Sequence, residues 1–288
     1  MLRSRASVPL AILLSFGCLV SSGREAAAQA VPADVAAERA AYRTWLRTAP
    51  NSPFAAIVLR PIGPGLTLGP KESDLPLDGL APSRLEDGRL AMLEEGGRRR
   101  PLPRHRAIPV GKYRLLVAGP PGRGTVTVFG PVKAPKEPAY YPYAARHAYE
   151  VRLVPPARAR GQRLLSPDGT EVEATEAGTV TLTVGGERVT LRVMRFPVTG
   201  GEASDLEIYV RDGTNGHGTY PAGRFVTLLP AGRGMYRLDF NRARNAFCAY
   251  NTVFPCPAPW RGNLIEAPVE AGERYTGGGL EVPIPTER

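Results

Sequence analysis

The order of apolar and polar residues along the chain predicts a protein built mainly from short β-strands. Apolar and polar positions alternate in runs such as those around Leu115 and Val126, and a period of two places one face of a strand against a core. The clearest unit is GTVTLTVGGERVTLRVMRF, in which two alternating runs flank Gly185 and Gly186. Two such runs separated by a glycine pair predict a β-hairpin with a primed turn.

One segment departs from this pattern and predicts an α-helix. In DVAAERAAYRTWLR, residues 34–47, the larger apolar side chains lie close to one stripe at helical spacing: Val35, Tyr42, Trp45 and Leu46. Asp34 is a candidate N-cap, and Pro50 and Pro53 follow the segment.

Composition supports a compact β protein. The 288 residues include 32 glycines and 30 prolines, and 43% are hydrophobic, so a packed core can form but few long helices can. About ten short strands separated by turns predict a mainly β fold, an antiparallel β-sandwich or partly open barrel with one N-terminal helix. The expected boundaries are 29–53 for the helix and its lead-in, and 54–288 for a single β domain.

The N-terminus is typical of a secretory signal peptide, residues 1–28. Two arginines precede the short apolar run PLAILLSFGCLV, and small residues follow it. Cleavage after Ala28 or Ala30 fits the small-residue rule, and an uncleaved anchor is the alternative. Lipidation at Cys18 is not favoured, because Ser15 stands where a lipobox requires leucine. The mature protein is therefore expected in the periplasm or secreted, without stable membrane insertion.

Removal of this leader leaves two cysteines, Cys248 and Cys256. In an oxidising compartment a pair this close in sequence is expected to form a disulfide. The alternative is zinc, which needs four ligands. Only three histidines could complete the set, and no C-x-x-C spacing occurs, so no metal site is predicted.

The chain is basic, with a formal net charge of +10. Outside the cell this charge argues against a nucleic-acid partner and leaves attraction to anionic surfaces open. The densest cluster is RRRPLPRHR, residues 98–106. A solvated loop is the favoured interpretation, and a polyanion contact is the alternative.

Polar residues become dense in a motif block over residues 205–275. Asp212, Thr214 and Asn215 leave a predicted strand together and can form an Asx-type turn. One interpretation is structural, since amides and carboxylates can satisfy an irregular backbone. The other is a ligand-binding site, whose candidate residues are Asp212, Thr214, Asn215, Tyr220, Arg224, Asp239, Asn241 and Glu273.

Familiar catalytic motifs do not occur in the sequence. There is no G-x-S-x-G elbow, H-E-x-x-H helix, G-x-G-x-x-G fingerprint or phosphate loop. No cofactor is predicted. An enzyme of this sequence would be a hydrolase or an isomerase that depends on carboxylates such as Asp212, Asp239 and Glu273.

The same block resembles a known family. DGTNGHGTYPAGRF, LDFNRARNAFCAYN, CPAPWRGN and AGER are similar, in this order, to the motifs of domain-of-unknown-function family 1684 (DUF1684). The resemblance implies a fold family and no activity. The sequence departs from the family pattern at Arg244, where tyrosine is usual, at Ala246 and Trp260, where proline is usual, and at Gly262, where glutamate is usual.

Together these observations predict an exported protein that binds a small polar or anionic ligand without catalysis. Arg224 and the turn from Asp212 to Asn215 are the expected contacts. A carboxylate-dependent hydrolase is the alternative, and a purely architectural motif block is a third interpretation. The oligomeric state is left open.

Overall fold

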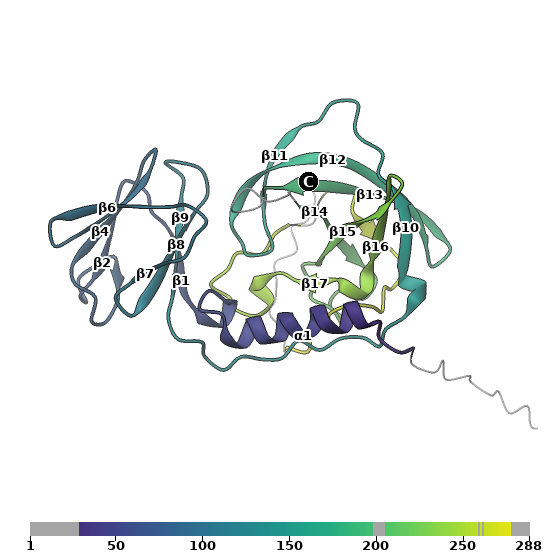
Figure 1. Ribbon diagram of the computed structural model, residues 1–288, viewed down its shortest axis with the longest axis horizontal. Coiled ribbons are helices and arrows are strands. Elements are labelled where there is room, and N and C mark those ends of the chain that lie inside the picture. The colour runs from purple at the N-terminus through teal and green to yellow at the C-terminus, as the bar shows by residue number, and fades with distance from the viewer. Residues whose placement is uncertain (1–28, 198–204, 259, 261, 278–288) are drawn as a thin grey trace, which may run out of the picture.

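The chain is mainly β, as predicted, in a computed structural model that describes residues 29–197, 205–258, 260 and 262–277. Strands hold 45% of the described residues and helices 12%. Figure 1 shows two β bodies side by side, with helix α1 beneath the second. The expected signal peptide, residues 1–28, lies outside the described residues.

The N-terminal body contains a four-stranded sheet, ordered β1-β9-β8-β7, and a five-stranded sheet, ordered β3-β2-β4-β5-β6. Leucines and valines of alternate strand positions, such as Leu85, Leu93 and Val126, fill its core. The strands are β1 Ala56–Pro61, β2 Leu66–Gly69, β3 Leu75–Pro76, β4 Ser83–Asp87, β5 Ala91–Glu95, β6 Arg98–Leu102, β7 Ile108–Val110, β8 Tyr113–Ala118 and β9 Thr125–Phe129.

The C-terminal body is one nine-stranded sheet. Seven strands follow the order β10-β16-β15-β14-β13-β12-β11, while β17 pairs with β15 and β18 lies parallel to β14. The strands are β10 Ala148–Arg152, β11 Gly161–Leu165, β12 Glu171–Val184, β13 Glu187–Phe196, β14 Asp205–Asp212, β15 Arg224–Gly232, β16 Met235–Asp239, β17 Arg244–Asn245 and β18 Leu264–Ile265.

The predicted hairpin is formed by β12 and β13. Its two turn glycines, Gly185 and Gly186, have φ of 59° and 88°, the positive values that a primed turn requires. Earlier in β12 the sheet bends at Gly178, where a Cβ would collide with the carbonyl oxygen of Val154. This close approach permits an isolated bridge between Val154 and Thr179. Because the bridge is isolated, the sheet does not close into a barrel in the part of the chain described here.

The predicted helix is confirmed as α1, Ala33–Thr48, and it packs along the C-terminal body. Its rings contact that body directly, since Trp45 and Phe247 lie 5.7 Å apart between centroids. Asp34 lies inside the first turn and makes no side-chain cap, so the predicted cap is wrong. Its carboxylate instead pairs with Arg242. Among the described residues, no helix has the length and apolar character needed to cross a membrane.

A third group of buried side chains lies where the two bodies meet. It includes Ala55 and Phe129 from the N-terminal body together with Phe225, Phe254 and Trp260 from the C-terminal body. The described residues also form four short 3-10 helices: η1 Pro53–Ala55, η2 Ala145–His147, η3 Phe240–Arg242 and η4 Phe247–Ala249. The predicted single domain over 54–288 stays a prediction.

Candidate functional site

Asp212 and Arg224 form a buried ion pair at the centre of the motif block. Arg224 Nη2 lies 2.8 Å from Asp212 Oδ2, and each side chain is 1% exposed. Nη2 also donates to the carbonyl of Val269 at 3.0 Å, and Nη1 donates to the carbonyl of Ala271. The guanidinium therefore fastens an irregular segment after β18 to strands β14 and β15.

The second oxygen of Asp212 organises the turn that follows β14. Oδ1 accepts hydrogen bonds from the backbone N of Thr214 at 2.9 Å, from its hydroxyl at 2.6 Å and from the N of Val269 at 3.1 Å. Asn215 Oδ1 accepts from the backbone N of Asp212 at 2.6 Å. The expected Asx-type turn is therefore present.

Tyr220 connects this turn to the cysteines. Its side chain is fully buried, and its hydroxyl lies 3.1 Å from Sγ of Cys256. Burial raises the pKa of Tyr220 to about 12. Cys256 forms the predicted disulfide with Cys248, with Cα atoms 5.5 Å apart.

Asp239 and Asn241 form a separate buried pair beside η3. Asp239 Oδ1 accepts from the backbone N of Asn241 at 3.0 Å and from its Nδ2 at 2.8 Å. The amide of Asn241 then bonds both backbone groups of Ala144, at 3.0 and 2.9 Å. This pair ties the segment before β10 to the end of β16.

Glu273 lies buried beneath β17. Its Oε2 accepts from the backbone N of Asn245 at 2.9 Å, and its Oε1 accepts from the hydroxyl of Tyr250. Burial raises the pKa of Glu273 to about 7, although the hydrogen bonds from Tyr250 and Asn245 act in the opposite direction.

Seven of the eight predicted residues are buried and Asn215 is half-buried. Their polar atoms are held mainly by other protein atoms. Arg224 links the Asp212 turn to the backbone of Glu273, with Nη1 3.3 Å from that carbonyl. Asp239 and Asn241 form a group of their own. None of the eight lines the cavity described next. Their direct contact with a ligand stays a prediction.

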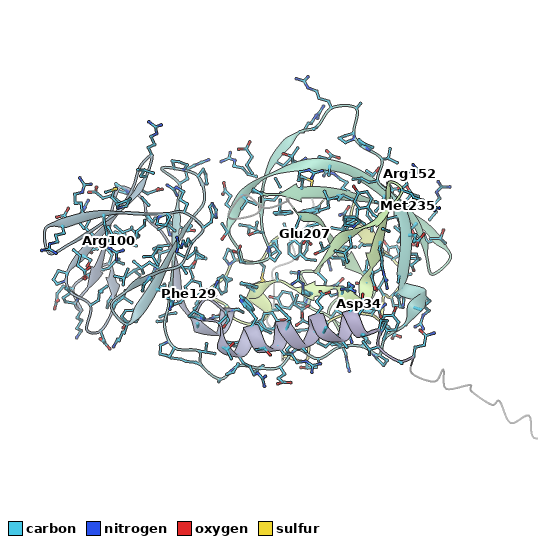
Figure 2. The ribbon with its side chains drawn as sticks, in the orientation of Figure 1. Asp34, Arg100, Phe129, Arg152, Glu207 and Met235 are labelled. Atoms are coloured by element: carbon cyan, nitrogen blue, oxygen red, sulfur yellow. A yellow bond between two sulfur atoms is a disulfide. The ribbon has the colours of Figure 1, made fainter. Side chains whose placement is uncertain are left out.

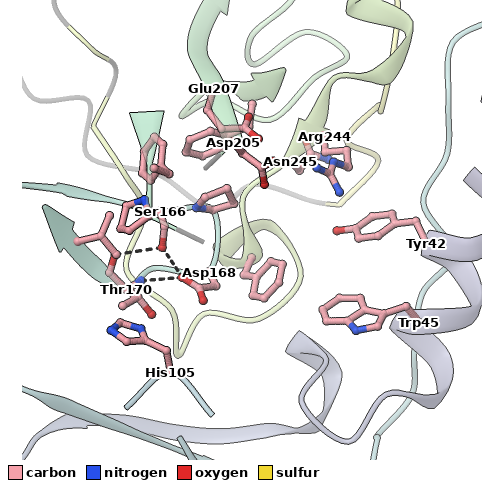
Figure 3. A pocket seen from close by; sticks show the side chains of 16 residues that line it. Tyr42, Trp45, His105, Ser166, Asp168, Thr170, Asp205, Glu207, Arg244 and Asn245 are labelled. Carbon is pink, nitrogen blue, oxygen red and sulfur yellow. Dashed lines mark hydrogen bonds between the residues drawn. The ribbon is translucent and has the colours of Figure 1, made fainter. Parts of the chain in front are cut away.

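A cavity of about 560 Å³ lies beside α1 and against the face of β14, β15 and β17. Figure 3 shows Tyr42 and Trp45 on the helix side of the cavity, across from Ser166, Asp168 and Thr170. Tyr42 and Trp45 come from the helix, and Phe225 and Phe247 come from the C-terminal body. The full lining is Tyr42, Trp45, His105, Ser166, Pro167, Asp168, Thr170, Val172, Phe196, Pro197, Asp205, Glu207, Phe225, Arg244, Asn245 and Phe247.

Arg244 brings a positive charge into this cavity. Its partner in the ladder is Phe225, so the two side chains lie on one face of the sheet. The guanidinium carbon is 5.5 Å from the ring centre of Tyr42, and no hydrogen bond or ion pair joins the guanidinium to another described residue. Burial acts to lower the pKa of Arg244, but the negative charge of Glu207 contributes to a net increase, so the group stays charged.

Glu207 is the buried carboxyl of the same cavity and lies inside the C-terminal body (Figure 2). It is 6% exposed, and its Oε1 accepts from the hydroxyl of Thr227 at 2.7 Å. Oε2 is buried and has no hydrogen-bond partner in the described part of the chain. Burial raises the pKa of Glu207 to about 7, against the lowering effect of Thr227 and Arg244.

The opposite side of the cavity is a tight turn between β11 and β12. Asp168 Oδ1 accepts from the hydroxyl of Ser166 and from the backbone N of Thr170. His105 reaches this side from the N-terminal body, with a φ of 59°. Burial lowers the pKa of His105. The cavity therefore lies where the two bodies meet.

Sequence reasoning singled out neither Glu207 nor Arg244 as a site residue. Glu207 was not recognised because it lies in DLEIYVR, a segment whose pattern predicts an ordinary strand. Arg244 carried a signal, since it is one of the departures from the family pattern. No group of three or more potential metal-ligating side chains occurs among the described residues.

Comparisons with known proteins identify a family and give no activity. A family described as "Protein of unknown function (DUF1684)" matches residues 136–274. The comparison with curated proteins gave no match. The solution NMR structure of an uncharacterized protein from Haloarcula marismortui is similar at 28% identity and a TM-score of 0.42, over 48% of this chain and 76% of that chain. Residues 136–274 of this chain match the DUF1684 family.

Proposed function

We propose that this protein binds a small amphipathic carboxylate in the cavity between its two bodies. The observation that carries the proposal is the guanidinium of Arg244, which faces the cavity without a hydrogen-bonding partner among the described residues. A partly dehydrated charge of this kind is stabilised by an anion. The planar fork of arginine matches a carboxylate in a bidentate geometry.

The aromatic side chains of the lining support the proposal that the same ligand carries an apolar group. Trp45, Phe225 and Phe247 line the cavity, and such rings bury large apolar areas. The volume of about 560 Å³ falls within the range of about 300–1,000 Å³ that is usual for small-molecule sites. A short acid with an aromatic or branched aliphatic group fits both features.

In this proposal the motif block has a supporting role. The buried carboxylate of Glu273 holds the backbone of Asn245, the residue after Arg244, and thereby fixes the short strand β17 against β15. Arg224 holds the backbone of the segment that carries Glu273. The motif residues would then position Arg244 and leave the ligand contacts to the cavity.

We further propose that the protein works outside the cytoplasm. The disulfide between Cys248 and Cys256 supports this location, because such bonds persist in oxidising compartments. The leader-like sequence at residues 1–28 supports it independently.

A carboxylate-dependent hydrolase is the second candidate. Its supporting observation is the pKa of Glu207, which burial raises to about 7 within a cavity, because a general acid or base works best near the operating pH. It predicts turnover of ester or glycoside substrates with a bell-shaped pH profile that is lost in Glu207→Gln.

Binding is tested by the unfolding midpoint of the mature protein with and without 3-phenylpropionate. We expect the midpoint to rise with ligand concentration, because a ligand that binds only the folded state stabilises it. Arg244→Gln should abolish the response. Arg188→Gln, at an exposed position of β13, is the matched control and should keep it. Equal responses in both variants, or none in the wild type across a panel of aromatic and aliphatic acids, would refute the proposal.

A further inference from the structure

Glu207 gives the cavity a buried carboxyl, in addition to the carboxyl groups of Asp168 and Asp205 in the lining. Its Oε2 is buried and has no hydrogen-bond partner among the described residues, while its Oε1 is already engaged by Thr227. A carboxylate of this kind calls for a hydrogen-bond donor. Simple carboxylate ligands carry no such donor, so they leave this oxygen unsatisfied.

The sheet places Glu207 and Arg244 on the same face. Glu207 pairs with Thr227 across β14 and β15, and Arg244 pairs with Phe225 across β15 and β17. Thr227 and Phe225 are two positions apart in β15, so all four side chains rise from one side of the sheet. The two charged groups thus flank β15 from opposite sides, and no ion pair joins them.

We infer that the ligand is a zwitterionic amino acid with a large apolar side chain, its carboxylate on Arg244 and its ammonium on Glu207. The apolar group would lie against Trp45 and the neighbouring rings. This inference rests on the proposed function and specifies the ligand class of the same cavity. It follows from the guanidinium of Arg244 and the buried carboxyl of Glu207, which line the same cavity without an ion pair between them.

The ionisation of Glu207 gives the two ligand types opposite pH dependence. An ammonium favours the ionised carboxylate, so an amino acid should bind more tightly at pH 8 than at pH 6. A simple acid favours the protonated carboxyl, so 3-phenylpropionate should bind more tightly at pH 6. His105, whose pKa is lowered by burial, would act on both ligands in the same direction. The other titratable groups of the lining are Tyr42, Asp168, Asp205 and Arg244.

The test is calorimetric titration of the mature protein with three probes: L-phenylalanine, 3-phenylpropionate and 2-phenylethylamine. At pH 8 we expect L-phenylalanine to bind roughly tenfold to a hundredfold more tightly than either single-charge analogue, as expected for a charge-assisted hydrogen bond. Glu207→Gln should remove this preference while keeping the binding of 3-phenylpropionate. Arg244→Gln should weaken both acids. Glu187→Gln and Arg188→Gln, at exposed positions of β13, are the matched controls.

The outcomes separate this inference from the proposed function. If 3-phenylpropionate binds through Arg244 and L-phenylalanine binds no more tightly, the amino-acid inference is overturned and carboxylate binding stands. If neither acid binds, both are overturned. The pH comparison uses the wild type alone, so it remains decisive even if a variant fails to fold. Tighter binding of L-phenylalanine at pH 6 than at pH 8 would contradict the role of Glu207.

Discussion

Replacing Glu207 with glutamine should stabilise the protein in a pH-dependent way. The side chain is buried in β14, and one of its carboxylate oxygens has no hydrogen-bond partner among the residues that the structure describes. Glutamine has nearly the same shape and can keep the bond from Thr227, but it never ionises. The substitution therefore removes the free energy that is lost when this carboxyl becomes charged inside the protein.

The magnitude follows from the pKa of Glu207, which burial raises from 4.5 to about 7. A carboxyl with a raised pKa binds more protons in the folded state than in the unfolded state. The stability that the protonated carboxyl of Glu207 contributes is therefore fully present below its unfolded pKa of 4.5. This stability is lost as the pH rises through the folded pKa of about 7. Between pH 5 and pH 8 the free energy of unfolding of the variant should therefore gain about 2 to 3 kcal/mol over the wild type.

Urea unfolding at pH 5, 6, 7 and 8 measures this difference. Glu273, whose pKa is also raised to about 7, is present in both proteins and cancels from the comparison. Glu187→Gln, at an exposed position, should show no pH-dependent gain. A constant difference between Glu207→Gln and the wild type from pH 5 to pH 8 would refute the argument, because it would mean that the buried carboxyl is ionised without penalty.

Three further predictions concern the motif block and the buried histidine. Asp212→Asn should lower the free energy of unfolding by about 3 to 5 kcal/mol, because it leaves Arg224 buried without its charge partner. A loss below about 1 kcal/mol in urea unfolding would argue against a structural role for this ion pair. Reducing the Cys248–Cys256 disulfide should lower the free energy of unfolding by about 2 to 3 kcal/mol, and an unchanged urea midpoint with dithiothreitol would contradict this. Burial lowers the pKa of His147, whose ring nitrogens have no hydrogen-bond partner among the described residues. The folded state therefore binds fewer protons, and its stability should fall as the pH drops below 6.5. An equally steep fall in His147→Phe would show that other groups cause it.

The strands could be predicted from the sequence because their apolar alternation is local. The β12–β13 hairpin needs only its own residues and the two turn glycines, so prediction and structure agree there. The role of Asp34 at the start of α1 could not be predicted in the same way. The carboxylate of Asp34 pairs with Arg242, a partner far along the chain, and this contact arises only in the folded protein.

The same distinction applies to the site. The density of polar residues from Asp212 to Glu273 predicted a candidate site in this part of the chain. The spacing of Asp212 and Thr214 predicted the Asx-type turn. The burial of the pair between Asp212 and Arg224 depends on the segment around Val269, which has no local signal. The cavity draws its lining from the helix, both bodies and several turns, so no single stretch of sequence indicates it.

The most direct test of carboxylate binding is an NMR titration of the isotope-labelled protein with 3-phenylpropionate at pH 6.5. We predict saturable shifts of the Trp45 indole and Arg244 guanidinium signals, both from groups that line the cavity, and no change at the hairpin turn of Gly185 and Gly186. Shifts centred instead on Asp212 and Arg224, or no saturable shifts at all, would contradict binding in this cavity.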